Sequence, residues 1–259
     1  MSKTDRTQPL SGQNCIFDAI RTDDLAQVQA ILAEDPSAVN AIAPKRPLDT
    51  RGMSPLQVSL CTGRHKKIAW LLLESGADVN YLPDRKIAEE ARPVLFDGVN
   101  AAIWNARRYA WDGKSTTPLQ LEWKHTKEES DDAFAFLQRM LELGADVSVT
   151  DHYGRNCLME VVSEASNLCP VRNQETGAFY PGRPITPEMC EDLQRIFRLL
   201  IDAGADRNNV SAFPRKASGS TTKMNLFGRS AVSCGMKQND KNRRNVHCGV
   251  NSKNNFEYQ

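Results

Sequence analysis

The side chains that could carry out chemistry are scattered along this chain in no catalytic arrangement. The four histidines (65, 125, 152 and 247) share no metal-ligand spacing, and the seven cysteines include no Cys-x-x-Cys pair. The motifs of phosphate-binding loops, zinc proteases and α/β-hydrolases are all missing. The cysteine pattern suits a reducing compartment rather than a disulfide framework or a zinc site. We therefore expect a cytoplasmic protein that is not an enzyme, with no cofactor, no metal and no small-molecule substrate.

Two pairs of adjacent carboxylates, Asp23-Asp24 and Asp131-Asp132, are the nearest approach to an acid–base constellation. Neighbouring residues on a helix point about 100° apart, so neither pair converges on one point. Acidic residues are favoured near the N-terminus of a helix, where they complement its dipole. Both pairs are predicted to mark helix starts.

Side chains typical of binding hot spots are concentrated in one stretch of the sequence. The aromatic and arginine residues of this stretch are Trp104, Arg107, Arg108, Tyr109 and Trp111, with Trp123 following. Because Trp, Tyr and Arg dominate interface hot spots, the stretch is a candidate site of partner contact. The favoured interpretation is nevertheless that the two tryptophans seven residues apart, 104 and 111, form one buried stripe of a helix. In either case we expect the two arginines to point outward.

The elements that must position these residues are indicated by a phrase that occurs three times. Its copies are Gly76-Ala77-Asp78-Val79-Asn80, Gly144-Ala145-Asp146-Val147-Ser148 and Gly204-Ala205-Asp206-Arg207-Asn208, and each directly follows an apolar helical run. Glycine just past a helix can take the left-handed conformation that ends it, and Asp then favours a turn. The same ending after the same kind of helix is typical of a repeat array.

The clearest repeat begins Gly52-Met53-Ser54-Pro55-Leu56-Gln57 and closes with the first copy of that phrase. It resembles the ankyrin repeat, which opens Gly-x-Thr-Pro-Leu-His and finishes Leu-Leu-x-x-Gly-Ala-Asp-Val-Asn. Ser54 is placed to cap a helix whose first residue is Pro55. Gln57 stands where the family usually has His, and we expect this change to loosen the polar tie between neighbouring repeats. The resemblance implies an all-α ankyrin-repeat solenoid of stacked helix-turn-helix units with short hairpin loops.

Four units are readable within the repeat domain, residues 13–208. They cover about 13–45, 50–80, 115–149 and 152–208, the last interrupted by an insertion at 167–186. Residues 81–115 have repeat length with little repeat sequence, but Phe96, Val99, Ala102, Ile103 and Ala106 recur at helical spacing. We interpret this stretch as a degenerate unit, the alternative being a long hairpin loop with a single helix.

The two ends of the chain differ from the repeat domain. Residues 1–12 are polar and predicted to be disordered. Residues 209–259 carry 9 basic against 2 acidic side chains, whereas residues 1–208 carry 24 against 30. The tail has no helical stripe and is predicted to be irregular or disordered, because it cannot bury enough apolar surface to offset its ordering entropy. No apolar run approaches the roughly 20 residues of a membrane-spanning helix, so we expect no membrane association.

The resemblance implies binding of a specific protein through the concave ankyrin face and the insertions. On that basis the candidate partner-binding residues are Arg51, Met53, Trp104, Arg107, Arg108, Trp111, His152 and Tyr153. A partner with a basic surface would suit the acidic body. A narrower form of this hypothesis is an inhibitor or toxin-immunity protein. The alternative is a nucleic-acid-associated adaptor that uses the basic tail, notably residues 241–244, although a solvated tail is the favoured interpretation.

Overall fold

The computed structural model describes most of the helical body and short pieces of the tail. The described residues are 12–61, 66–88, 92–109, 123–168, 185–213, 222–225, 236–238, 246–248, 250–251 and 255–256. The predicted disorder of residues 1–11, most of the 167–186 insertion, and Trp111 lie outside them. The chain divides into two compact units, Met1–Asp97 (unit 1) and Gly98–Gln259 (unit 2).

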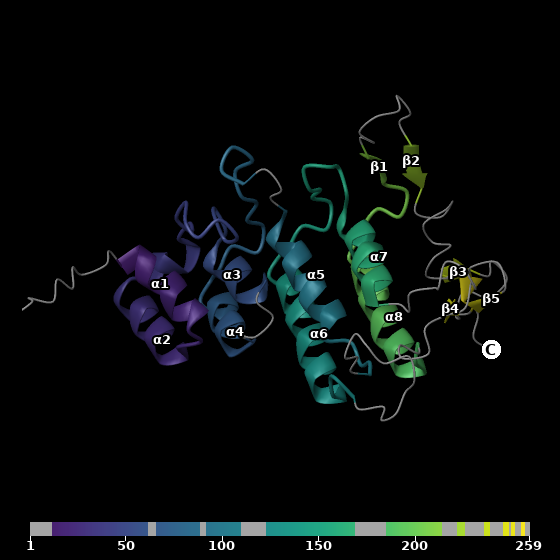
Figure 1. Ribbon diagram of the computed structural model, residues 1–259, viewed down its shortest axis with the longest axis horizontal. Helices are drawn as coiled ribbons and strands as arrows, with labels where there is room; N and C mark the ends of the chain where they lie inside the picture. Colours follow the sequence, from purple (N-terminus) through teal and green to yellow (C-terminus); the bar gives the residue numbers. More distant parts are fainter. Residues whose placement is uncertain are drawn as a thin grey trace, which may run out of the picture. The chain divides into compact units, whose positions relative to one another are not determined.

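Unit 1 consists of two helix pairs and a short 3-10 helix (Figure 1). Its elements are α1 (Gly12–Arg21), α2 (Leu25–Glu34), η1 (Pro36–Asn40), α3 (Pro55–Cys61) and α4 (Lys66–Glu74). Helix α1 packs on α2 and α3 on α4, while α1 also packs on α3 and α2 on α4. The second pair therefore repeats the arrangement of the first. The core of the unit is formed by fully buried apolar side chains, among them Ile16, Phe17, Ile20, Leu56, Ile68 and Leu72.

The helix starts of unit 1 are capped as the sequence predicts. The Asp24 carboxylate accepts a hydrogen bond from the backbone N–H of Gln27 at 2.9 Å and so begins α2. The Ser54 hydroxyl accepts one from the N–H of Gln57 at 3.2 Å, with Pro55 as the first residue of α3. Each cap satisfies a backbone donor that has no partner within the helix.

Gln57 corrects one expectation. Its side chain is buried, and its amide nitrogen donates to the Asp97 carboxylate at 3.0 Å and to the Arg92 carbonyl at 3.1 Å. The predicted loosening of the polar tie is therefore wrong. The amide of glutamine is long enough to make a bond to the following segment in place of an imidazole.

Unit 2 contains the remaining helices, and the unit boundary falls within the first of them. They are α5 (Val94–Trp104), α6 (Lys127–Glu142), α7 (Cys157–Leu168) and α8 (Pro187–Asp202). The apolar residues of 96–106 that recur at helical spacing are all buried, so the predicted helix is confirmed. Gly98 lies against α6, because a Cβ added there would come within 2.4 Å of the Met140 sulfur. Helix α5 is thus the close neighbour of α6, and the first residues of the predicted unit 115–149 fall outside the described part.

Contacts across unit 2 show which helices run side by side. Asn100 and Trp104 of α5 bond to Glu160 and Glu164 of α7. Because both residue numbers advance by four, α5 and α7 run parallel, in register. Helices α6 and α8 are also neighbours, since residues 130 and 131 contact residues 192 and 195. One helix pair, α5 with α6, is therefore followed by a second, α7 with α8, in the same order.

The three copies of the repeated phrase form the same turn. Gly76, Gly144 and Gly204 have φ values of 89°, 90° and 98°, the left-handed conformation predicted for them. In each copy the aspartate then accepts a hydrogen bond from the backbone N–H two residues later, at 2.8 to 2.9 Å. The sequence prediction of a common helix ending is confirmed for α4, α6 and α8.

Helix α6 begins earlier than the acidic pair suggested. Thr126 caps it through a reciprocal pair of hydrogen bonds with Glu129, the capping-box arrangement. Asp131 and Asp132 therefore lie in the second turn, and the prediction that they mark a helix start is wrong. The prediction is right for residues 23 and 24.

Regular structure described between residues 12 and 209 is entirely helical, which agrees with the predicted all-α class. The tail, predicted to be irregular, instead contains short strands among its described residues. They are β1 (Val210–Phe213), β2 (Thr222–Asn225), β3 (Met236–Gln238), β4 (Val246–Cys248), β5 (Val250–Asn251) and β6 (Asn255–Phe256). They pair antiparallel as β1–β2, β3–β4 and β5–β6. Such local pairing needs only a few residues and no apolar stripe, which is why the composition did not indicate it.

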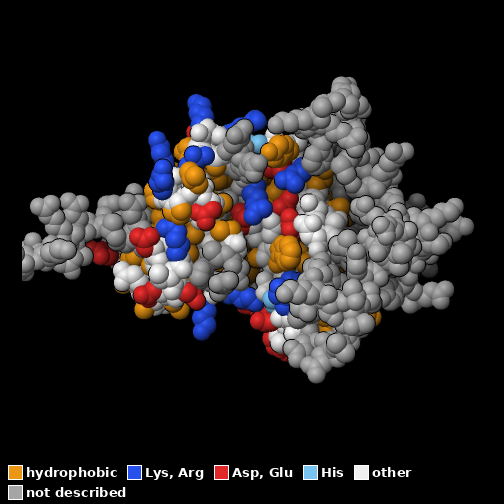
Figure 2. All heavy atoms as spheres, viewed as in Figure 1, with side chains coloured by type: hydrophobic (Ala, Val, Ile, Leu, Met, Phe, Trp, Pro, Cys, Tyr) orange, Lys and Arg blue, Asp and Glu red, His pale blue; other side chains and the backbone are white. Residues whose placement is uncertain are grey.

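In Figure 2 the upper end of unit 1 displays basic and hydrophobic side chains, whereas its lower part displays both acidic and basic ones. Among the described residues, no helix combines the length and apolarity that crossing a membrane requires.

Candidate protein-interaction site

The site is built where the chain leaves α5 and where it enters α6. Tyr109 and Trp123 form an isolated antiparallel bridge, and their rings are in contact, with centroids 4.5 Å apart and planes tilted by 31°. Next to this bridge the backbone N–H of Lys124 donates to the carbonyl of Arg108 at 2.8 Å. The two segments, 104–109 and 123–125, are therefore held side by side. We call Trp104, Arg108, Tyr109 and Trp123 the aromatic patch.

The two tryptophans of the aromatic patch are exposed to an unusual degree for such large apolar side chains. Trp104 is 40% exposed and Trp123 is 44% exposed. The interpretation of Trp104 as part of a buried helical stripe is therefore wrong. The stripe of α5 is formed instead by Phe96, Val99 and Ile103, which are completely buried.

Trp104 is held in place although its ring is accessible. Its indole nitrogen donates to the Glu164 carboxylate at 2.9 Å, which fixes the ring to α7. The Arg108 guanidinium lies 5.3 Å from the ring centroid and also donates to the Trp104 carbonyl at 3.1 Å. Cation–π stacking of this kind is favourable and orients both side chains. The indole is thus presented to solvent in a defined orientation, so little rotamer freedom remains to be lost on binding.

From Trp104 toward the start of α7, a series of hydrogen bonds and ion pairs links α5, α7 and the loop before α7. The Asn100 amide donates to Glu160 at 3.0 Å, and this carboxylate, only 2% exposed, also lies 3.6 Å from Arg155. Arg155 pairs with Asp151 at 2.6 Å and lies 5.7 Å from the Tyr153 ring centroid. These contacts fix the loop before α7, and they leave the Tyr153 ring 40% exposed.

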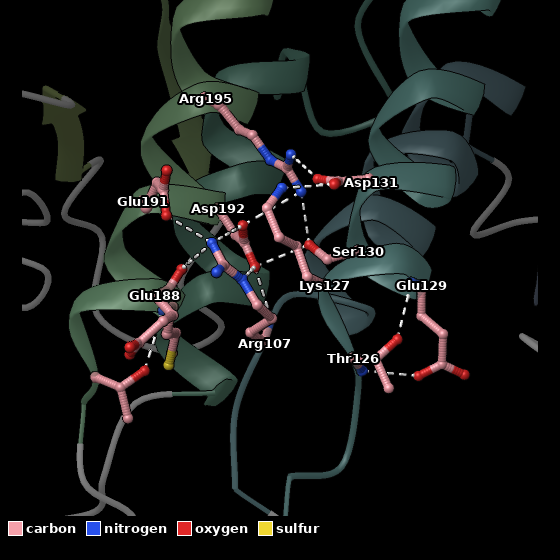
Figure 3. Close-up of polar contacts among 12 residues, drawn as sticks. Arg107, Thr126, Lys127, Glu129, Ser130, Asp131, Glu188, Glu191, Asp192 and Arg195 are labelled. Carbon is pink, nitrogen blue, oxygen red and sulfur yellow. Dashed lines mark hydrogen bonds and ion pairs between the residues drawn. The ribbon is translucent and has the colours of Figure 1, made fainter.

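Arg107, the neighbour of Arg108, has the opposite environment (Figure 3). Its side chain is 13% exposed and forms an ion pair with Asp192 of α8, whose side chain is 1% exposed. The backbone N–H of Arg107 and two side-chain nitrogens donate to the Asp192 carboxylate at 2.8 to 3.0 Å. A further guanidinium contact reaches Glu191 at 2.6 Å. The expectation that Arg107 points outward is wrong, because a buried acid on α8 draws it inward.

The Asp192 carboxylate is the hub of an ionic network between α6 and α8. The Ser130 hydroxyl donates to it at 2.8 Å, and Arg195 lies 3.2 Å from it. Arg195 also donates to the Ser130 hydroxyl at 2.7 Å and forms an ion pair with Asp131, which in turn pairs with Lys127 at 2.6 Å. We call Arg107, Ser130, Asp131, Asp192 and Arg195 the ionic network.

The ionic network and the aromatic patch differ in how their surroundings shift the pKa values of their titratable groups. Burial alone would raise the pKa of Asp192, but hydrogen bonds from Arg107 and Ser130 outweigh it and lower the pKa. The same contacts with Asp192 raise the pKa of Arg107. Both groups therefore remain charged at neutral pH, as a fully paired buried ion pair requires. At the aromatic patch, burial and then the charge of Arg108 lower the pKa of His125 below its ordinary value of 6.5.

No group in the described part of the chain resembles a reactive centre. Burial raises the pKa of the Cys61 thiol to about 11 and that of Cys157 to about 12, so both stay protonated at neutral pH. Nor do three or more His, Cys, Asp or Glu side chains meet among these residues in a way that could hold a metal ion. The arrangement can position aromatic and cationic side chains, which is the chemistry of recognition.

The predicted site residues are only partly brought together. Trp104 and Arg108 share the aromatic patch, Arg107 belongs to the ionic network, and Trp111 lies outside the described residues. His152 and Tyr153 occupy the loop before α7, at the opposite end of that helix from Trp104. Arg51 and Met53 belong to unit 1, in the loop before α3, and both are half-buried.

Two important residues were missed, Asp192 and Ser130. Each occupies a position of the apolar stripe of its helix: Asp192 falls between Met189 and Ile196 on α8, and Ser130 precedes Ala133 and Leu137 on α6. A polar residue on a buried stripe needs a partner, and this signal was present in the sequence. Comparison with protein-family models and with curated proteins finds no match for this chain.

Proposed function

We propose that this protein is a protein-interaction module of the ankyrin-like kind that binds a specific protein partner through the aromatic patch. The observation that carries the proposal is the pair of tryptophans, each exposed by 40% or more and each held by contacts from another segment. Large aromatic side chains that are exposed yet fixed are unusual in a monomer surface and typical of binding hot spots.

The repeated order of helix pairs supports the architectural part of the proposal. In each unit one helix pair follows another in the same order, and three helices end in the same turn. Within unit 2 the loop with Tyr153 precedes α7, the helix that holds Trp104, so we include this loop in the proposed binding surface.

A narrower form of the proposal is that binding inhibits the partner, as an immunity protein inhibits a toxin. Occlusion of a partner's site requires only a rigid surface, which the fixed rings of the aromatic patch provide. A cytoplasmic location is part of the proposal, supported by the free thiols of Cys61, Cys157 and Cys190.

Affinity capture from a lysate of the source organism tests the proposal. The full chain is compared with Trp104→Ala and Trp123→Ala variants, and bound proteins are quantified by mass spectrometry. Leu143→Ala is the matched control, because Leu143 is an apolar residue of similar exposure, 41%, in the turn after α6. We expect one protein to be recovered near stoichiometrically by the wild type and the control, and to be lost with the tryptophan variants.

Two outcomes would contradict the proposal. Equal recovery by the wild type and both tryptophan variants would exclude the aromatic patch. Recovery that is abolished by nuclease and by alanine substitution of Lys241, Arg243 and Arg244 would favour the nucleic-acid-associated adaptor instead.

A further inference from the structure

A second surface is formed by two loops of unit 1 that pack on each other. We call these loops, residues 41–54 and 81–88, the unit 1 tip. Within the first loop the N–H of Ala43 donates to the Met53 carbonyl at 2.8 Å. The Tyr81 hydroxyl donates to the Gly52 carbonyl at 2.6 Å, and a Cβ on Gly52 would lie 2.9 Å from the side chain of Ile87. The tip is therefore a fixed structure joined across both loops.

The tip is positively charged within a unit that is otherwise acidic. Its basic residues are Lys45, Arg46, Arg51, Arg85 and Lys86, against two acids, Asp49 and Asp84. The rest of the described part of unit 1 has four basic and eight acidic residues. Glu89 and Glu90, which follow the second loop, lie outside the described residues and do not enter these numbers.

None of the five cations of the tip forms an ion pair within the described part of the protein, whereas Arg21 and Arg92 of the same unit are paired with Asp18 and Asp97. Asp84 is occupied locally, since its carboxylate accepts a hydrogen bond from the Lys86 backbone N–H at 2.8 Å. Positive charge is thus available to an incoming group.

Apolar side chains are exposed among these charges. Ile42 is 56% exposed, Leu48 69% and Leu82 42%. They are three of the seven large hydrophobic residues that are exposed in the described chain, and all three belong to the tip. Surfaces that mix aliphatic side chains with unpaired cations complement segments that mix aliphatic side chains with carboxylates.

We propose that the unit 1 tip binds an acidic segment of a protein that also carries leucine-like side chains. A nucleic acid would use exposed aromatic rings for base stacking, and a bilayer surface would use them at its interface. The tip exposes none, because Tyr81, its one aromatic residue, is half-buried with its hydroxyl bonded to Gly52. This inference goes beyond the proposed function, because it concerns a second surface, and it differs from the sequence-based expectation of a basic partner. It is carried by unit 1 alone, so it can fail while the aromatic patch still binds.

The full chain is titrated against short fluorescein-labelled peptides, and binding is followed by fluorescence anisotropy. The probe is a peptide of alternating Glu and Leu; the comparison peptides replace Glu with Lys, or Leu with Ser. We expect the Glu–Leu peptide to bind best, the Lys peptide not to bind, and the affinity of the Glu–Leu peptide to fall as salt is raised.

Variants locate the binding site. The double variant Lys45→Glu with Arg46→Glu is expected to lower the affinity for the Glu–Leu peptide by about tenfold or more. Leu48→Ser is expected to lower this affinity by a smaller factor. The matched control is Lys66→Glu with Lys67→Glu, which reverses two charges on α4, away from the tip. Circular dichroism of every variant checks the fold, and Trp104→Ala is expected to leave peptide binding unchanged.

The proposal is overturned by any of three results. The first is that the Glu–Leu peptide does not bind. The second is that the α4 control loses as much affinity for this peptide as the variant at residues 45 and 46. The third is that an oligothymidine strand or phosphatidylserine vesicles bind more tightly than the peptide and also depend on residues 45 and 46. In each case the proposed function of the aromatic patch is still tested separately by Trp104→Ala.

Discussion

Arg107 and Arg108 are adjacent in the sequence, yet they belong to regions with opposite properties. Arg107 enters the ionic network, where Asp192 takes up its hydrogen-bonding capacity. Arg108 stacks on the exposed Trp104 at the edge of the aromatic patch. The comparison shows that residue type alone does not identify a hot spot: what matters is whether the chain already supplies the partner. Substitutions in the two regions should therefore have opposite effects on stability and binding.

The largest effect is expected from Arg107→Ala, which would leave the Asp192 carboxylate buried without its main partner. Removal of one member of a buried ion pair costs about 3–5 kcal/mol of unfolding free energy. Urea denaturation of the variant measures the loss. Arg198→Ala, an exposed arginine of the same helix α8, is the control and should change stability by less than about 0.5 kcal/mol. A loss below about 1 kcal/mol for Arg107→Ala would show that the network is not structural.

Trp104→Ala should behave in the opposite way, with a large effect on binding and a small one on stability. Truncation of a hot-spot tryptophan costs about 2 kcal/mol or more of binding free energy, a factor of about 30 in Kd. Titration calorimetry against the captured partner measures it, with Leu143→Ala as the control. If Trp104→Ala unfolds at much lower urea concentration than the wild type, the ring is structural and the distinction between the two regions fails.

The ionic network should also make stability depend on pH. Because the pKa of Asp192 is lowered in the folded protein, its ionised form stabilises the fold at pH values above the ordinary carboxyl pKa of about 3.9. This contribution is lost as the pH falls through the lower, folded value. Urea midpoints measured from pH 7 down to pH 2 should therefore fall less steeply for Asp192→Asn than for the wild type. If the urea midpoints of the wild type and of Asp192→Asn fall equally steeply with pH, ionised Asp192 does not stabilise the fold.

The smallest effect concerns His125 at the aromatic patch. After burial, the charge of Arg108 is the largest cause of its lowered pKa. Arg108→Ala should therefore raise the pKa of His125, and Arg107→Ala should move it less. A histidine titration by NMR distinguishes the two variants. If the pKa of His125 is unchanged in Arg108→Ala, the charge of Arg108 does not act on His125.

Local features of this fold were predictable because their causes lie within a few residues. The glycine turns after α4, α6 and α8 follow from Gly and Asp at fixed positions, and α5 follows from the spacing of its apolar residues. The environment of Arg107 was not predictable in this way, since Asp192 lies 85 residues further along the chain. Only the presence of an acid on an apolar stripe indicated that some cation had to be its partner.

The candidate site was predicted in composition but not in arrangement. The sequence places Trp104, Arg108 and Trp123 in one region, yet the bridge that brings Tyr109 beside Trp123 depends on chain geometry over 14 residues. Likewise, the exposure of Trp104 depends on the distant Glu164, which holds its indole nitrogen at the surface of α7. Long-range polar contacts of this kind leave no periodic pattern in the sequence.

The Tyr109–Trp123 bridge has a consequence for protein engineering. The bridge holds residues 109 and 123 next to each other through the contact between their rings. Arg107, through its bond to Asp192, fixes the chain on one side, and the Thr126 cap of α6 fixes it on the other. Any engineered change between α5 and α6 therefore has to preserve both ends of this bridge, residues 109 and 123.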